Sequence, residues 1–349
     1  MPYQNTALWL PKRGGRFEVS PAPYTPPGSE QIVVRARALA VNPVDGLSGF
    51  VYRIVLPWLT FPAVVGSDVA GEVVEVGPGV TRLQPGDRVA GHALGVEKSQ
   101  NRPAEGAFQH YVVLMQHMVA PIPESLSFEQ ASVLPLALST AASGLFQEDQ
   151  LALTLPGAGP ADRAETVLVW GGSTSVGSNA IQLARNAGYR VVATASPHNF
   201  NYVRSLGAAE AVDYHSPAAV DEIVDRVGDS PLAGTLAITP GSLPPAVKIA
   251  SRTAGSKRVA SARPGPLTQL RARRARRLGI QVSTVWGSTL KDNEVGPAIY
   301  AGFLPAALAA GAYRAAPDAS VVGDGLASIP AALQQLRDGV SATKLVVTV

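Results

Sequence analysis

One segment constrains the fold more than any other: an apolar run that leads through a glycine-rich loop into a helix. Thr166–Trp170 is apolar after its first residue, as expected of a strand buried on both faces of a parallel sheet. The loop 171–177 comes next, and residues 179–187 then place apolar side chains at helical spacing. Residues 190–194 form the next apolar run. This order of strand, loop, helix and strand predicts a doubly wound α/β domain.

The rest of the chain predicts a second, different domain. Its 349 residues are too many for one compact core. Residues 31–40 alternate like a half-buried strand, 70–77 form another, and turn signals at 77–79 and 85–87 punctuate them. Short strands with Gly and Pro between them indicate a β-barrel-type domain. Residues 345–349 read as one more strand, which local pattern assigns to neither domain.

Positive charge is concentrated in one short segment. Residues 271–277 hold five arginines, whereas the whole chain has a formal net charge of +3. The basicity is therefore local, and binding of the whole protein to nucleic acid is not expected. We interpret the segment as a solvated helix face; the alternative is a docking site for an acidic macromolecule.

Cysteine usage and apolar runs exclude further classes. The chain has no cysteine, which excludes disulfides and thiolate zinc sites. The N-terminal residues 1–15 lack the order of a secretory signal. The longest apolar stretch, 132–146, contains Pro135 and is too short to span a bilayer. We therefore expect a cytoplasmic protein with no membrane partner.

The loop 171–177 has the context of a dinucleotide fingerprint. Glycine permits close approach of the backbone, and the N-terminus of the next helix offers N–H groups to a pyrophosphate. Thr174 stands where a central glycine is usual. The alternative is a plain Gly/Ser-rich turn, but the position between a strand and a helix favours the binding site.

The residues after the second strand decide the type of dinucleotide. An NAD site places Asp or Glu there to hold the ribose hydroxyl. Residues 194–199 contain no acid and several donors, and Arg204 lies about a helical turn later. Donors without a carboxylate favour a 2′-phosphate, and hence NADPH. Ser196 and Asn199 are also good helix caps, and both roles can coexist.

Two further segments resemble signatures of the medium-chain dehydrogenase/reductase superfamily, namely Val65–Gly77 and Leu83–Val89. In zinc-dependent members the first signature carries a His-Glu pair, which Ser67 and Asp68 replace here, and Asn42 stands in place of a cysteine ligand. The resemblance therefore implies a zinc-free member with no metal site. His92, His110, His117 and His215 are interpreted as packing or surface residues.

Within the zinc-free members, the chain is similar to fungal trans-acting enoyl reductases. The segments that carry the similarity are 134–142, 196–200, 205–208, 212–214, 323–326 and 340–346. The resemblance implies an α/β fold with a GroES-like β-barrel-type catalytic domain, residues 1–126 completed by 290–349. A doubly wound Rossmann domain for NADPH, residues 127–289, accompanies it. It also implies that the final strand rejoins the first domain.

The resemblance further implies which residues bind ligands. The expected NADPH contacts are Val44, Asp45, Leu47, Gly172, Ser173, Thr174, Ser175, Val176, Gly177, Ser196, His198, Asn199, Tyr214, Ile238, Thr239, Ala342 and Thr343. The expected substrate contacts are Leu134, Pro135, Leu136, Ser139, Trp286 and Gly287. One departure is Leu47, which stands where relatives commonly carry a lysine that touches cofactor or substrate.

Reduction of an activated alkene requires a group that stabilises enolate charge and a source of a proton. Candidates are the Thr140 hydroxyl, nearby backbone N–H groups and Tyr52; solvent is another proton source, and Tyr52 is equally compatible with a packing role. The expected substrate is an enoyl thioester on coenzyme A or a carrier, with an acidic carrier domain docking at Arg271–Arg277. Alternatives are a quinone or small-enone oxidoreductase and a non-catalytic NADPH-binding protein. A monomer or homodimer is expected.

Overall fold

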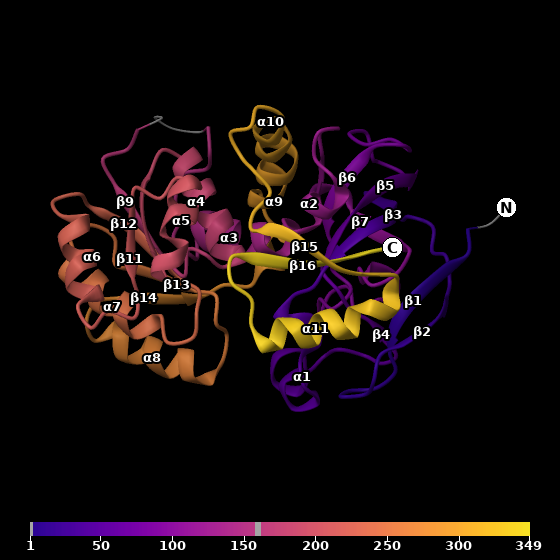
Figure 1. The fold of residues 1–349 in the computed structure, drawn as a ribbon, viewed down its shortest axis with the longest axis horizontal. Helices are drawn as coiled ribbons and strands as arrows, with labels where there is room; N and C mark the ends of the chain where they lie inside the picture. The colour runs from indigo at the N-terminus through magenta and orange to yellow at the C-terminus, as the bar shows by residue number, and fades with distance from the viewer. Residues whose placement is uncertain (1–2, 158–161) are drawn as a thin grey trace. The chain divides into compact units, whose positions relative to one another are not determined.

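The computed structural model describes residues 3–157 and 162–349 (Figure 1). The chain divides into two compact units, Met1–Leu136 with Ile299–Val349, and Ala137–Ala298. Both boundaries lie later than the sequence-based ones at 126/127 and 289/290. At the first boundary the reason is helix α2, Phe128–Ser132, which packs on strands β3, β5 and β6 of the first unit.

The first unit is built on two sheets whose strands pair antiparallel, except that β15 and β16 pair in parallel. Its seven-stranded sheet has the order β15-β16-β3-β5-β6-β8, with β7 also paired to β3, and a smaller sheet has the order β2-β1-β4. The strands are β1 Asn5–Leu10, β2 Glu18–Ala22, β3 Gln31–Ala40, β4 Ala63–Val64, β5 Asp68–Val76, β6 Arg88–His92, β7 Tyr111–Met115, β8 Val119–Pro121, β15 Asp318–Asp324 and β16 Thr343–Thr348. This architecture confirms the predicted β-rich first domain.

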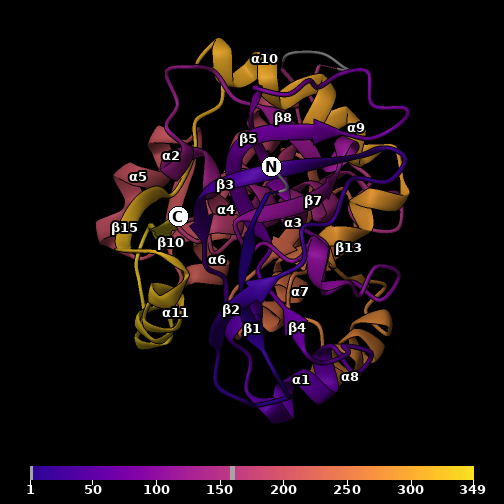
Figure 2. The same ribbon diagram turned by 90° about the vertical axis from the view of Figure 1, so that its right-hand side faces the viewer.

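Strand β3 is the centre of the larger sheet. It pairs with β5 along one edge and with β7 along the other (Figure 2). Strand β16 pairs with the C-terminal end of β3 on the same edge as β7. Val346 of β16 stands opposite Ala40. The C-terminal strand therefore completes the sheet begun by the N-terminal part of the chain. Backbone hydrogen bonds to β3 place the C-terminal strand in the first unit, whereas the local sequence of residues 345–349 assigned it to neither domain.

The helices of the first unit are short and lie around these sheets. They are η1 Pro43–Gly46, α1 Gly49–Val55, η2 Pro103–Glu105, η3 Gln116–Met118, α2, α10 Leu304–Ala309, η7 Leu326–Ser328 and α11 Ile329–Asp338. Helix α11 packs on β16 and on η1. Helix α3, Pro135–Phe146, begins in the first unit and continues into the second.

The second unit is a doubly wound parallel sheet of order β11-β10-β9-β12-β13-β14. Its strands are β9 Thr166–Trp170, β10 Arg190–Ala195, β11 Glu210–Asp213, β12 Leu232–Ala237, β13 Arg258–Ser261 and β14 Gln281–Thr284. The order reverses between β9 and β12, which is the place where such sheets bind dinucleotides. The predicted Rossmann domain is confirmed.

Helices connect these strands and cover the sheet. They are α4 Ser175–Asn186, η4 Pro197–Asn199, α5 Phe200–Ser205, α6 Ala219–Val227, α7 Leu243–Arg252 and α8 Pro266–Arg276. Helices α6, α7 and α8 lie side by side in contact (Figure 1). Leu168, Ile223, Ile249 and Val259, all fully buried, form part of the core between them and the sheet. The unit ends with η5 Gly287–Asp292 and α9 Val295–Pro297, and η6, Ala298–Phe303, crosses the boundary.

Within residues 3–157 and 162–349, none of the helices has the length and apolar character needed to cross a membrane.

Candidate functional site

The glycine loop brings the start of helix α4 directly onto the end of strand β9. A Cβ atom at Gly177 would lie 2.1 Å from the carbonyl oxygen of Gly171, and one at Gly172 would lie 3.0 Å from the Ala193 side chain. Gly171 has a φ of +102°, which favours glycine. Side chains at these glycines would therefore collide with neighbouring atoms. Their absence leaves the backbone N–H groups of the loop close to the helix start, as a pyrophosphate site requires.

Thr174 caps helix α4. Its hydroxyl donates to the carbonyl oxygen of Gly171 at 2.8 Å and accepts from the N–H of Gly177 at 3.0 Å. Ser173, Ser175 and Val176 are half-buried, and the N–H groups of Ser175 and Val176 precede the helix's own hydrogen-bond ladder. The departure from glycine at position 174 thus has a structural reason, and the geometry of the loop fits a nucleotide phosphate.

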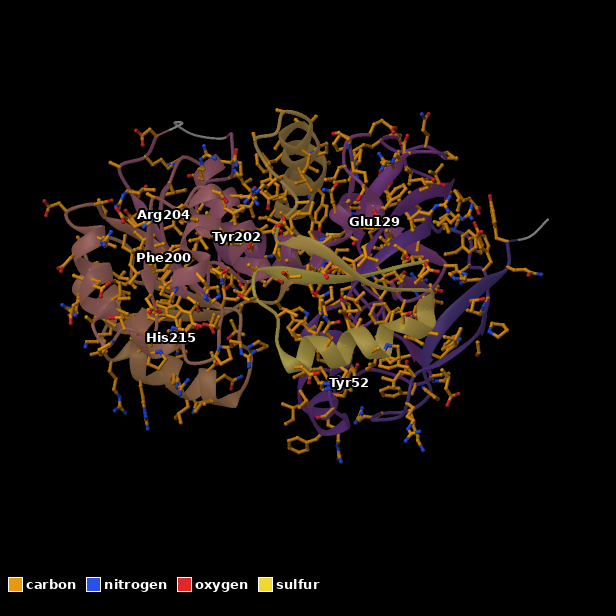
Figure 3. All side chains as sticks on the ribbon, in the orientation of Figure 1. Tyr52, Glu129, Phe200, Tyr202, Arg204 and His215 are labelled. Atoms are coloured by element: carbon orange, nitrogen blue, oxygen red, sulfur yellow. The ribbon has the colours of Figure 1, made fainter. Side chains whose placement is uncertain are left out.

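The structure brings Ser196 and Tyr214 together at the ends of adjacent strands. The Ser196 hydroxyl donates to the Tyr214 hydroxyl at 3.3 Å. His198 is exposed in η4, directly after β10, whereas Asn199 is buried. Arg204 is exposed on α5 and lies over the Phe200 ring at 5.7 Å (Figure 3). The donors predicted from the sequence therefore gather around the carboxyl end of β10.

A carboxylate lies at the end of the next strand rather than at the end of β10. Asp213 ends β11 and accepts from the backbone N–H of His215 at 3.0 Å; its carboxylate also contacts the His215 ring nitrogen Nδ1 at 2.8 Å. The backbone hydrogen bond from His215 is the main reason that the pKa of Asp213 lies below its ordinary value. The His215 ring stacks on Tyr214 with centroids 4.0 Å apart. Asp213 and His215 thus lie beside Tyr214, a predicted cofactor contact; Asp213 was left unassigned from the sequence, and His215 was interpreted as a packing or surface residue.

Strand β12 ends against the glycine loop. The N–H of Ile238 donates to the carbonyl oxygen of Trp170 at 3.1 Å, and a Cβ atom at Gly171 would lie 2.8 Å from the Thr239 side chain. Ile238 is buried and Thr239 is half-buried. The loop after β9 and the turn after β12 are therefore neighbours at the point where the strand order reverses, as the sequence-based assignment of Ile238 and Thr239 requires.

Thr140 on α3 lies against Gly287. A Cβ atom at Gly287 would be 2.6 Å from the Thr140 hydroxyl oxygen, so a side chain there would collide with it. Thr140 is half-buried, whereas Ser139 is buried. The structure thus brings together one predicted catalytic residue and one predicted substrate residue from segments that are far apart in the sequence.

A cavity of about 930 Å³ opens in the second unit beside the C-terminal end of α3. Trp286, a predicted substrate residue, lines it together with Phe146, Gln147 and Thr289. The Gln147 side chain donates to the Thr289 hydroxyl at 2.9 Å, and that hydroxyl donates to the carbonyl oxygen of Trp286 at 2.7 Å. Phe146 and Thr289 were not among the predicted substrate contacts, because no sequence motif marks their positions.

Asp45 and Tyr52 are held by contacts inside the first unit, and the cofactor role of Asp45 and the catalytic role of Tyr52 stay predictions. The Asp45 carboxylate accepts from the Asn42 N–H at 2.8 Å and from the Ser67 hydroxyl at 3.4 Å. Burial, and then the neighbouring Asp68, raise the pKa of Asp45 to about 7. The Tyr52 hydroxyl, on a ring only 2% exposed, donates to the carbonyl oxygen of Asp45 at 3.0 Å. This contact agrees with the packing role that the sequence left open for Tyr52.

The positions that match zinc ligands in other members form a buried network. Asn42 donates to the Asp68 carboxylate at 2.9 Å, the Lys344 ammonium pairs with that carboxylate at 3.0 Å, and Lys344 also donates to the Asn42 side-chain oxygen. His92, which stands opposite Asp68 on the neighbouring strand β6, is buried, and burial lowers its pKa to about 4. Among residues 3–157 and 162–349, no group of three or more His, Cys, Asp or Glu side chains is arranged to hold a metal ion.

Lys344 is the member of this network that sequence reasoning missed. The sequence contained one sign of its role: Lys344 is the single charged residue in the apolar strand 343–348. In the structure only 4% of the Lys344 surface is exposed. A buried ammonium requires a countercharge. The residue that supplies this countercharge could not be predicted, because Asp68 lies far from Lys344 in the sequence.

The remaining predicted residues lie near the ends of elements already described. Val44 and Leu47 are half-buried at η1. Ala342, with a φ of +48°, precedes β16, and Thr343 is the first residue of that strand. Leu134 and Pro135 are buried at the start of α3, and Leu136 is half-buried.

Comparison with known proteins gives consistent relatives. The alcohol dehydrogenase GroES-like domain family matches residues 28–124. Dehydrogenase azaJ of Aspergillus niger is 46% identical over 352 residues, covering 99% of each chain. Trans-enoyl reductase himH of Aspergillus japonicus is 36% identical over 356 residues, 99% of this chain and 97% of that protein. A crystal structure of an alcohol dehydrogenase superfamily protein from Novosphingobium aromaticivorans, 25% identical, superposes with a TM-score of 0.76 over 99% of each chain.

A GroES-like unit and a Rossmann unit with a phosphate-binding loop together define an oxidoreductase that uses a nicotinamide cofactor. The chain belongs to the medium-chain dehydrogenase/reductase family, among relatives that include fungal dehydrogenases and trans-enoyl reductases.

Proposed function

We propose that this protein is an NADPH-dependent reductase of an activated alkene, with an enoyl thioester as substrate. The observation that carries the proposal is the similarity to trans-enoyl reductase himH along essentially the whole length of both chains. The substrate part rests on that relative and is an analogy. The cofactor part has independent support from the geometry of the second unit.

The choice of NADPH rests on the residues after β10. Ser196 lies in this position with Tyr214 in contact, His198 and Arg204 are exposed nearby, and η4 itself contains no acid. The nearby carboxylate, Asp213, is engaged by His215. Hydroxyl, imidazole and guanidinium groups suit a dianionic phosphate, whereas a ribose hydroxyl is ordinarily held by a carboxylate.

The reduction adds a hydride to the β-carbon of the alkene and a proton to the α-carbon, which gives the saturated thioester. When bound, NADPH supplies the hydride. Negative charge develops on the thioester oxygen between the two additions, and a hydrogen-bond donor there lowers the barrier. Thr140 is our candidate, because its half-buried hydroxyl lies on α3 among the predicted substrate contacts and packs against Gly287, another of them. Tyr52 is not assigned the proton, because its hydroxyl is buried on a backbone carbonyl; solvent is the proposed donor.

Two observations favour a second candidate, a quinone or small-enone oxidoreductase. The 46%-identical relative from Aspergillus niger has the general name dehydrogenase, which specifies no thioester. Leu47 also replaces the lysine that the family resemblance led us to expect. A third candidate is a protein that binds NADPH without catalysis, which the departures at Leu47 and Thr174 would favour. Thr174 no longer favours it, because its hydroxyl has a structural role in the loop.

A paired assay tests the proposal. Oxidation of NADPH is measured at fixed enzyme concentration with crotonyl-CoA and, separately, with 1,4-naphthoquinone. We expect turnover of the thioester with kcat/KM at least about tenfold above that of the quinone. The reverse preference would establish the second candidate. Tight NADPH binding with no turnover of either compound would establish the third.

A Gly177→Ala protein is the control for both reactions, since it removes the nucleotide cradle while leaving α3 unchanged. At an NADPH concentration below the Kd, it should turn over both compounds at least about tenfold more slowly than the wild type.

We also propose that an acidic carrier domain delivers the thioester to helix α8. Arg273, Arg274, Arg276 and Arg277 are exposed there, and within the described part of the chain none of them forms an ion pair. Leu267, Leu270 and Leu278 are exposed by 57%, 47% and 63%. Apolar side chains among unpaired positive charges suit an acidic partner that also offers apolar contacts.

A further inference from the structure

We propose that Asp68 is a positioning residue, whose carboxylate links Lys344 and Asn42 to the first turn of helix α3. Its function is to fix the segment 134–140 that the proposed substrate contacts. The kinetic part of this inference rests on the proposed function, whereas the structural part does not.

The carboxylate uses its two oxygens for different partners. Oδ1 accepts from the backbone N–H of Leu136 at 2.6 Å. Oδ2 accepts from the Asn42 side-chain amide at 2.9 Å and pairs with the Lys344 ammonium at 3.0 Å. Lys344 is further held by the side-chain oxygen of Asn42. The four residues come from β5, the start of α3, the N-cap of η1 and β16, so the network joins four separate parts of the first unit.

The Leu136 N–H is the donor at the start of α3 that matters most. Helix α3 begins at Pro135, which has no N–H, so Leu136 supplies the first one. The first N–H groups of a helix precede its own hydrogen-bond ladder and take acceptors from outside it. A negative charge beside a helix N-terminus is favourable, because it faces the positive end of the helix dipole. Asp68 supplies both an acceptor for the Leu136 N–H and the favourable charge.

Burial makes Lys344 necessary to this arrangement. Asp68 is 0% exposed and Lys344 is 4% exposed. A carboxylate in such a place is costly without a paired and hydrogen-bonded cation. Asp45 and His92 are the other titratable groups beside the network; burial favours the neutral form of each. Lys344 is thus the cation that allows a charged Asp68 to hold α3.

An amide cannot replace this carboxylate. A carboxylate accepts hydrogen bonds at both oxygens, whereas an amide accepts at one and donates from the other. With its oxygen toward Leu136, the new amide would turn its NH₂ group toward the Lys344 ammonium. With its oxygen toward Lys344, it would turn its NH₂ group toward the Leu136 N–H. Either orientation loses one of the two contacts, which makes Asp68→Asn a sharp test.

Hydrogen exchange in the protein without ligands measures the structural role directly. In Asp68→Asn, amides of residues 134–141 should exchange about tenfold faster than in the wild type, while α4 and α11 change by less than about twofold. The matched control is Glu105→Gln, which neutralises another buried carboxylate of the first unit whose partners are Gln31 and Arg102. The control should not accelerate exchange in 134–141.

A double variant tests the bridging geometry. In Asp68→Asn with Lys344→Met, the ammonium that repels the new amide is absent, and the Asn42 amide can turn over to offer its oxygen. Exchange in 134–141 should then return toward the wild-type rate, although two polar contacts have been removed. Exchange in the double variant as fast as in Asp68→Asn or faster, or no effect of Asp68→Asn on 134–141, would refute the positioning role.

Asn42→Ala keeps the test decisive if Asp68→Asn does not fold, because it removes only a neutral donor from Oδ2. Exchange should rise by about threefold and only in 134–141; a uniform rise through the first unit would refute the proposal.

Kinetics then separate positioning from general stability. In whichever of these variants folds, kcat/KM for crotonyl-CoA should fall at least about tenfold while the Kd for NADPH stays within about twofold. If kcat/KM for crotonyl-CoA and the affinity for NADPH fell by the same factor, Asp68 would have a merely structural role. If the wild type does not reduce crotonyl-CoA at all, the proposed function fails, and the exchange result still decides the role of Asp68.

Discussion

The first turn of α4 rests on the backbone that leaves β9: a Cβ atom at Gly177 would lie 2.1 Å from the Gly171 carbonyl oxygen. Backbone atoms cannot move aside as a flexible side chain can. The two glycines therefore set the distance between the strand end and the helix N-terminus, and hence the geometry of the phosphate site.

Gly177→Ala should weaken NADPH binding at least about tenfold and destabilise the second unit by about 1–3 kcal/mol, as overpacking does. Isothermal titration and chemical unfolding measure the two effects. The control is Ala180→Gly in the same helix, which costs about 1 kcal/mol or more without touching the loop and should leave the Kd nearly unchanged. Equal Kd values for Gly177→Ala and the wild type would contradict the assignment of the cradle.

Cofactor preference should depend on Ser196. We expect the wild type to bind NADPH at least about tenfold more tightly than NADH. Ser196→Asp should reverse that order, because a carboxylate beside the 2′-phosphate costs about 1–3 kcal/mol and can accept from a ribose hydroxyl. Fluorescence titration with both nucleotides provides the measurement. Ser196→Asn, similar in size but neutral, should keep the preference for NADPH; equal wild-type affinities would show that the site does not discriminate.

Asp45 and His92 should make stability depend on pH in opposite directions. Folding raises the pKa of Asp45 from 3.8 to about 7 through burial and Asp68, so the folded protein binds a proton that the unfolded chain releases. That contribution is present below pH 3.8 and is lost as the pH rises toward 7. Burial lowers the pKa of His92 from 6.5 to about 4, so its contribution is present above pH 6.5 and is lost as the pH falls toward 4.

The pH ranges in which Asp45 and His92 affect stability overlap. A variant that removes one of the two groups should therefore show the pH dependence that is due to the other. In Asp45→Asn, unfolding free energy should rise between about pH 4 and 6.5 by up to about 1.4 kcal/mol per pH unit. In His92→Gln, it should fall between about pH 4 and 7 with a similar limit. Urea unfolding at several pH values gives both curves. Parallel curves for the two variants would mean that these groups are not the titrating ones.

Zinc should be absent from the purified protein, and chelators should leave activity intact. The reason lies in the network at the zinc-ligand positions, where Asn42 and Asp68 bind each other and the Lys344 ammonium. A cation in that place would meet a positive charge. Elemental analysis and activity after dialysis against a chelator test this; activity lost on chelation and restored by zinc would overturn it.

Replacement of the α8 arginines should affect carrier-bound substrate selectively. Charge steering raises association rates and weakens with salt, whereas isolated surface charges contribute little. We expect kcat/KM for the carrier-bound thioester to fall about tenfold at low salt and much less at high salt, with no change for crotonyl-CoA. The variant replaces four residues by Gln: Arg273, Arg274, Arg276 and Arg277.

A variant with the same loss of charge in the first unit is the control; it replaces exposed Lys12, Arg16, Arg53 and Lys98 by Gln. If both quadruple variants behave alike, or if both substrates respond equally, α8 is an ordinary solvated helix.

The sequence by itself determined the elements whose signal is local. The apolar run 166–170 is strand β9, and the alternating run 31–40 is strand β3, because burial of one or both faces of a strand is written in its own side chains. The glycine loop and the absence of an acid after β10 likewise lie in contiguous residues, so the nucleotide site could be predicted. The start of α4 was placed later than it lies, because the capping hydroxyl of Thr174 extends the helix to Ser175.

Only the tertiary structure decided the contacts between distant segments. Strand β16 joins β3 through backbone hydrogen bonds, which leave no trace in side-chain pattern. Lys344, Asp68 and the first turn of α3 meet because the fold brings three distant segments to one place, and the carboxylate is stable there only because the other two are present. The partner of the Tyr52 hydroxyl was likewise open until that hydroxyl was seen to donate to the Asp45 carbonyl. The type of a residue sets the interactions that its side chain can form, whereas the tertiary structure sets which partners are within reach.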